Sequence, residues 1–200
     1  MVIRRLSLQT CMILMWLLSP LLTLSLFAYG EGAADRGSLH NEKLSVRFAE
    51  LLKVNSADSA NKIVKEIWNI WINDSPVLEH RQMLKDGIRL MSKQDYMAAE
   101  KIFSEIIEVE PEYIEAWNKR ATVRYIRREF DKSLSDIYEV LSLEPNHFGA
   151  LAGLGLIMLT QQDFEGALLA YKQVLLINPF SPDALILVPE LNQKVLGLNI

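Results

Sequence analysis

The sequence has 200 residues, of which 50% are hydrophobic, and its formal net charge is −4 at pH 7. This length suits one domain with a sizeable core, and the acidic balance argues against nucleic-acid binding, which needs a basic surface. The single cysteine, Cys11, lies near the N-terminus, so an intrachain disulfide or a thiolate metal site in the rest of the chain is excluded.

The N-terminal segment has the pattern of an export signal. Arg4 and Arg5 precede an apolar run over residues 11–28, which is the order of charged and hydrophobic regions in a secretory leader. Small residues near Gly30 offer a cleavage point, but the run is also long enough to anchor the chain in a bilayer. The sequence therefore predicts a signal peptide or a membrane anchor over residues 1–30, and both place the rest of the chain outside the cytoplasm.

Residues 31–43 are polar and contain glycine, which predicts a flexible linker. Helical periodicity begins after it, with apolar residues on one face of two successive segments. Asn55 and Ser56 between these segments supply a turn and a helix cap. We expect a helical hairpin over residues 44–76, and its apolar positions are Leu44, Phe48, Leu51, Leu52, Ile63, Ile67, Ile70 and Trp71.

From residue 80 onward the sequence repeats with a period of 34 residues, marked by Pro111, Pro145 and Pro179. Small residues that let helices cross closely, bulky residues on one helix face and acid–aromatic pairs keep the same spacing. A period of this size indicates stacked copies of one helical unit and directs the function toward binding. The small columns are Gly87, Ala121, Gly155 and Ala99, Ser133, Ala167; the bulky columns are Phe103, Ile137, Tyr171 and Ile106, Val140, Val174; the pairs are Asp95-Tyr96, Glu129-Phe130 and Asp163-Phe164.

This pattern resembles the tetratricopeptide repeat (TPR), a 34-residue helix–turn–helix unit. The matching residues are Trp117, the pair Leu154-Gly155, Ala99 with Phe103, and Ala167 with Tyr171. The resemblance implies an all-α fold, a right-handed α-solenoid of antiparallel helix pairs. It places repeats at residues 80–113, 114–147 and 148–181, and it makes residues 44–76 a degenerate TPR-like hairpin.

The repeat stops after Pro179. Ser181 and Pro182 predict an N-cap and a first helical residue, and Pro189 stands where another repeat would need a small residue. We expect residues 182–200 to form a capping helix that covers the end of the stack. Its apolar face is Ala184, Leu185, Val188, Leu191 and Val195.

The middle repeat departs from the TPR pattern. Arg120 and Arg124 stand where the family favours leucine and tyrosine, and their spacing puts them on one helix face. Their guanidinium groups either pair with nearby acids such as Asp131 or Asp136, or form an anion contact with a carboxylate or phosphate of a ligand.

Sequence patterns of catalytic sites are missing. The three histidines, His40, His80 and His147, form no metal-spaced pair. The two within the repeats fall at junctions, where surface or capping roles are expected. Neither a glycine-rich phosphate loop nor a Gly-x-Ser-x-Gly elbow occurs. We therefore expect a protein that is not an enzyme and that needs no metal or cofactor.

The resemblance implies a partner-binding groove lined by the first helix of each repeat. Asn118 suits contact with a peptide backbone because its amide both donates and accepts, and Tyr125 adds a flat ring and a hydroxyl. The mostly apolar groove favours an amphipathic helix or a hydrophobic peptide, unless the chain's own terminal helix fills it. The implied groove residues are Leu84, Ile88, Met91, Asn118, Thr122, Tyr125, Ala152, Leu156 and Leu159.

The leader and the resemblance together predict a small exported bacterial protein. It would be periplasmic, or anchored to the inner membrane by residues 6–29, with no other membrane contact. Its expected function is that of a scaffold or adaptor that binds a protein partner, and no nucleic acid, in the cell envelope. A homo-oligomerisation module and a non-catalytic accessory subunit of an envelope complex are the alternatives.

Overall fold

The computed structural model describes residues 42–197, almost all of which belong to the unit Lys43–Ile200. The predictions for the leader at residues 1–30 and for nearly all of the linker lie outside the described residues. Every regular element within the described residues 42–197 is a helix, which confirms the all-α prediction for this part of the chain. The helices are residues 42–51, α2 (Ala57–Ile72), α3 (Leu78–Ser92), α4 (Tyr96–Val109), α5 (Ile114–Ile126), α6 (Phe130–Leu143), α7 (Phe148–Thr160), α8 (Phe164–Ile177) and α9 (Pro182–Val195).

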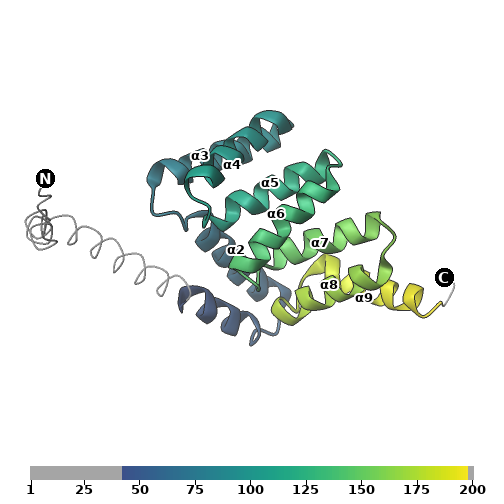
Figure 1. Ribbon diagram of the computed structural model, residues 1–200. Helices are drawn as coiled ribbons and strands as arrows, with labels where there is room; N and C mark the ends of the chain where they lie inside the picture. Colours follow the sequence, from purple (N-terminus) through teal and green to yellow (C-terminus); the bar gives the residue numbers. More distant parts are fainter. Residues whose placement is uncertain (1–41, 198–200) are drawn as a thin grey trace, which may run out of the picture. The chain divides into compact units, whose positions relative to one another are not determined.

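Three helix pairs, α3/α4, α5/α6 and α7/α8, stack in chain order, and from α3 to α9 each helix packs against the next one along the chain (Figure 1). The second helices begin at Tyr96, Phe130 and Phe164, which are 34 residues apart. The period of the sequence is therefore a period of the structure. Within the part of the chain that the structure describes, no helix combines the length and apolar character needed to cross a bilayer.

The acid–aromatic pairs mark the start of each second helix. Just before them, Gln94, Arg128 and Gln162 each have φ of 62°, in the left-handed region, so the chain turns back in the same way in all three pairs. The side chains of Asp95 and Asp163 then accept hydrogen bonds from the N–H groups of the first turn. The acid is thus an N-cap, and the aromatic residue after it is the first residue of the helix.

The small columns are explained by the bulky side chains that face them. A Cβ on Gly155 would stand only 2.6 Å from a ring atom of Tyr171, and Gly87 faces Phe103 just as closely. Each of these aromatic residues is buried in the core of its helix pair. Glycine is therefore needed on the first helix so that the aromatic ring of the second can lie against its backbone.

The N-terminal hairpin folds as two helices, but it does not take the place of a first repeat. The backbone of α2 approaches α5, and its contact with the backbone of α3 is at most marginal. Trp71 shares a core with Phe148 and Tyr171 from the far end of the stack. The hairpin packs there because its indole rings are bulky and need room. Gly149 at the start of α7 leaves the space that Trp68 fills.

Hydrogen bonds fix the point where α2 leads into the stack. Tyr113 donates its hydroxyl proton to the carbonyl oxygen of Ile72 over 2.5 Å. Ser75 donates to the Glu110 carboxylate over 2.6 Å, and the same carboxylate oxygen lies 2.5 Å from Nδ1 of His80. The C-terminal end of α2 is therefore tied to the junction between α4 and α5.

The last helix, α9, packs against α8 through part of its predicted apolar face. Ala184 and Leu191 are buried there. Leu185 and Ile186 are exposed instead, so the apolar surface of α9 extends beyond the side that covers α8. The proline within the helix, Pro189, is exposed as well.

Candidate functional site

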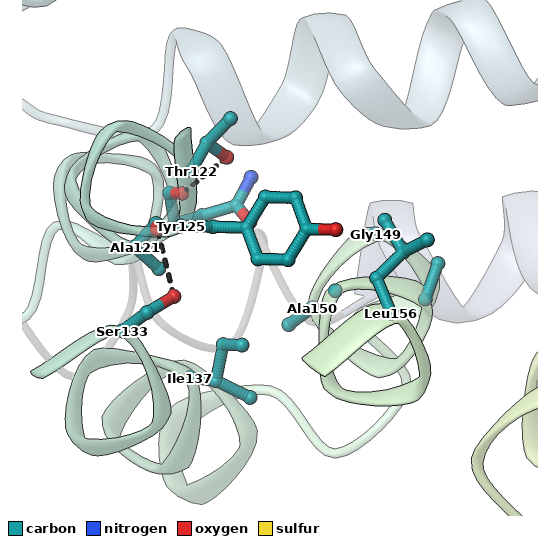
Figure 2. Close-up of a pocket in the computed structure, with 11 residues that line it drawn as sticks. Ala121, Thr122, Tyr125, Ser133, Ile137, Gly149, Ala150 and Leu156 are labelled. Carbon is teal, nitrogen blue, oxygen red and sulfur yellow. Dashed lines mark hydrogen bonds between the residues drawn. The ribbon is translucent and has the colours of Figure 1, made fainter. Parts of the chain in front are cut away.

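A pocket of about 160 Å³ lies between α5 and α7, with residues of α6 contributing to its wall (Figure 2). We call the side of the stack lined by α3, α5 and α7 the first-helix face. Every lining residue from α5 and α7 belongs to the first helix of its pair, so the pocket is part of this face. The lining residues are Asn118, Ala121, Thr122, Tyr125, Ser133, Ile137, Gly149, Ala150, Ala152, Gly153 and Leu156.

The polar groups around this pocket are mostly engaged by the backbone. Thr122 donates its hydroxyl proton to the carbonyl oxygen of Asn118 over 2.9 Å, and Ser133 donates to that of Ala121 over 2.8 Å (Figure 2). None of the lining residues carries a charge. The pocket is therefore suited to an apolar group, since it offers neither an ion-pair partner nor a free Ser or Thr proton.

Tyr125 supplies a polar atom that is still available. Its ring packs against Phe130, with centroids 5.8 Å apart, and extends from α5 toward α7 (Figure 2). The hydroxyl points to the side where Gly149 and Leu156 lie, and none of the hydrogen bonds between the pocket-lining residues involves it (Figure 2). A bound segment could place an apolar side chain in the pocket and a backbone group against this hydroxyl.

The structure brings together five of the nine predicted groove residues, Asn118, Thr122, Tyr125, Ala152 and Leu156. The other four lie elsewhere. Leu84 is fully buried in the core of α3 and α4, which rules it out as a groove residue. Ile88 and Met91 pack half-buried against the same core, and Leu159 packs against the core that contains Trp71.

A buried polar cluster lies beside the pocket, at the N-terminal ends of α5 and α7. Glu115 and His147 are both fully buried, with Oε1 of the carboxylate 2.9 Å from Nε2 of the imidazole. Nδ1 of His147 accepts a hydrogen bond from the N–H of Ala150 and caps α7, which confirms a capping role. Asn118 donates to both carboxylate oxygens of Glu115 over 3.2 Å, so its amide donors are already engaged.

The charge of the Glu115 carboxylate is stabilised inside the protein. Burial by itself would raise the pKa of this carboxyl, but Lys119, whose Nζ lies 3.2 Å from Oε2, and hydrogen bonds from His147 and Asn118 hold the pKa below its ordinary value. Glu115 is thus an anion that joins consecutive repeats at the base of the first-helix face.

Comparison with known proteins identifies the family. No protein-family model matches the chain. A TPR repeat-containing protein of Rhizobium etli is 32% identical over 163 residues, which are 82% of this chain and 79% of that protein. The chain belongs to the tetratricopeptide-repeat family. The predicted resemblance is therefore confirmed at the level of the family.

Solved TPR structures share the fold. The Sgt2 TPR domain from Aspergillus fumigatus superposes with a TM-score of 0.56 at 20% identity, covering 60% of this chain and 82% of that domain. The first TPR domain of Spaghetti (RPAP3), described as bound to an HSP90 peptide, has a TM-score of 0.55 at 18% identity and covers 58% and 92%. At this identity the likeness concerns the fold alone.

The two arginines that depart from the TPR pattern are held by acids of the chain itself. Arg120 binds the Asp136 carboxylate through Nε at 3.0 Å and an Nη atom at 2.8 Å. Arg124 reaches the same carboxylate at 2.8 Å and Glu100 at 3.0 Å, and Glu100 also pairs with Arg127. Asp136, not Asp131, is thus the shared acceptor, and this TPR core contains an ion-pair network where the family usually has apolar packing.

The sequence analysis missed Glu115, Trp68, Trp71 and Gly149 as contributors to this face. A signal existed for two of them, because Glu115 and Gly149 occupy the same position in consecutive repeats, near the start of the first helix. The two tryptophans gave no such signal. Over the described residues, no group of three or more His, Cys, Asp and Glu side chains could hold a metal ion.

Proposed function

We propose that this TPR protein is a non-enzymatic adaptor that binds a protein partner through the pocket between α5 and α7. The observation that carries the proposal is an uncharged pocket of about 160 Å³ on the first-helix face, next to the Tyr125 hydroxyl, which makes no hydrogen bond to another lining residue. A related TPR domain of the same fold is described as bound to a peptide, which supports a polypeptide as the ligand.

The expected ligand group is an apolar side chain of a peptide or helix. Ile137, Ala150 and Leu156 give the pocket apolar walls, and burial of an apolar side chain there is favourable by roughly 1.5–3 kcal/mol. The guanidinium groups of Arg120 and Arg124 are paired with Asp136, so neither offers an unpaired cation to an anionic ligand. The pairing favours an apolar anchor over the anion contact.

The proposed setting is the bacterial cell envelope. Arg4 and Arg5 followed by the apolar run over residues 11–28 support export. The similar protein of Rhizobium etli supports a bacterial source. The repeats would then act in the periplasm, either free or anchored by residues 6–29, and the protein would serve as an adaptor or as a non-catalytic subunit of an envelope complex.

Affinity capture of the full chain after cross-linking in cells tests this function. Leu156→Arg puts a charged side chain at the pocket, and Leu156 is 40% exposed, so the fold should tolerate the change. Leu169→Arg on α8 is the matched control, because Leu169 is 64% exposed and does not line the pocket. We expect the partner to be lost with Leu156→Arg and kept with Leu169→Arg. Equal recovery with both variants would contradict the proposal.

Self-association is a second candidate, and the surface of α9 favours it. Leu185 and Ile186 are 50% and 61% exposed and adjacent on this helix, and apolar surface of this kind is typical of contacts between chains. Light scattering of the purified protein over a range of concentrations tests it. A dimer that Ile186→Lys converts to a monomer would support self-association, and a monomer at all concentrations would exclude it.

A further inference from the structure

Two indole rings of α2 lie in a matching surface at the N-terminal ends of α5 and α7. Trp71 stacks on the imidazole of His147, with ring centroids 4.0 Å apart and planes inclined by 19°. Nζ of Lys119 lies 4.7 Å from the centroid of the Trp68 ring, a cation–π contact. Gly149 lets the Trp68 ring approach, since a Cβ there would stand 2.5 Å from it. We call Lys119, His147 and Gly149 the aromatic-binding surface.

This surface is continuous with the proposed partner pocket. Gly149 contacts Trp68 and also lines the pocket. Asn118 lines the pocket as well, and it donates to the Glu115 carboxylate that holds both Lys119 and His147. A segment bound in the pocket and extended along the first-helix face would therefore meet the position that α2 occupies.

Several features make α2 an exchangeable occupant of this surface. It lies outside the stack of helix pairs. Its Trp71 is buried in a core with Phe148 and Tyr171 of the last pair, whereas the buried cores centred on α3 with α4 and on α5 with α6 do not include Trp68 or Trp71. The indole N–H of Trp71 is buried without a hydrogen-bond partner among the described residues, which weakens the docking. The bond between Tyr113 and Ile72 ties α2 at one end, so a displaced α2 would stay attached.

We propose that the aromatic-binding surface recognises a partner helix with two aromatic side chains three residues apart, and that α2 is its resident ligand. The proposal rests on the proposed function, since it extends the same partner site and adds competition by α2. Because α2 is covalently attached, its effective concentration is on the order of mM. A partner helix binds only when it competes with α2, so α2 sets the affinity of the site.

A labelled peptide of residues 57–72 tests the proposal on the full chain, by fluorescence anisotropy. It should bind the variant Trp68→Ala/Trp71→Ala at least about tenfold more tightly than the unaltered protein, because the variant's own α2 competes poorly. A peptide with both tryptophans replaced by alanine should not bind. The variant Trp117→Ala, which alters a tryptophan of α5 outside this surface, should bind the peptide no better than the unaltered protein.

Absence of peptide binding to a folded Trp68→Ala/Trp71→Ala variant would overturn the proposal, and so would equal binding of the alanine peptide. Hydrogen exchange of the unaltered protein gives an independent test if the variant does not fold. Amides in the middle of α2 should exchange through an opening that leaves α5 and α7 protected. Exchange of α2 only together with α5 and α7 would overturn the proposal. Neither result depends on the pocket's partner, so the proposed function stands or falls separately.

Discussion

The imidazole of His147 donates a hydrogen bond from Nε2 to Oε1 of Glu115 over 2.9 Å and joins the first helices of two consecutive repeats. The direction of the bond follows from the other ring nitrogen, since Nδ1 accepts from the N–H of Ala150 and must be unprotonated. The neutral imidazole thus satisfies both partners at once. A buried carboxylate and a helix cap are linked through one ring, on which Trp71 also stacks.

The stability of the protein should fall in acid partly through Glu115. Its pKa in the folded protein is below the ordinary value of 4.5. The stability that Glu115 contributes is therefore fully present above about pH 4.5 and is lost as the pH falls through the folded pKa, because the unfolded chain takes up the proton first. Urea denaturation should show that the free energy of unfolding of Glu115→Gln falls less between about pH 6 and pH 3 than that of the unaltered protein.

Glu139→Gln is the control for this experiment, because Glu139 is exposed on α6. The free energy of unfolding of Glu139→Gln should depend on pH in the same way as that of the unaltered protein. An unchanged pH dependence in Glu115→Gln would show that the buried carboxylate is not stabilised as its contacts indicate.

Two glycines of α7 should respond in opposite ways to replacement by alanine. Gly155→Ala places a Cβ 2.6 Å from Tyr171 and should lower the free energy of unfolding by about 1–3 kcal/mol through overpacking. Gly153→Ala meets only Ile137 at 3.4 Å and should be neutral or raise stability by about 0.5–1 kcal/mol, since alanine favours the helix. Chemical denaturation measures both, and equal effects would contradict the packing described.

Removing the charge of Asp136 should be costly, because two guanidinium groups depend on it. Arg120 and Arg124 both bind this carboxylate, which is 1% exposed. Asp136→Asn should destabilise the protein by about 3–5 kcal/mol, as expected when one partner of a buried ion pair is lost. Asp131→Asn, at an exposed position five residues earlier on α6, should lower stability by no more than about 1 kcal/mol. Thermal unfolding distinguishes these outcomes, and similar effects would contradict the network.

The parts of the structure that could be predicted from the sequence depend on local contacts that repeat. The pairing of Gly155 with Tyr171 and the capping by Asp163 occur within one helix pair. They have counterparts in the first pair, at Gly87 with Phe103 and at Asp95, in register with the 34-residue period, so the sequence pattern reveals them. Trp68 meets Gly149 only once, across a long stretch of chain, and no period marks such a contact. Of the predicted groove residues, those on α5 and part of those on α7 line the pocket, whereas Leu84 on α3 faces the core, because the family's pattern does not show how far each first helix is covered.

The central claim is that the first-helix face between α5 and α7 binds a protein partner. A photo-cross-linking amino acid at position 122 tests it most directly, because Thr122 is exposed and lines the pocket. Tyr138 on α6 is the control position, because it is 55% exposed and lies outside the pocket. Illumination of cells that contain the full chain should give a defined protein adduct from position 122 and none from position 138. An adduct from position 138 with none from position 122 would contradict the claim and place the binding surface on the second helices.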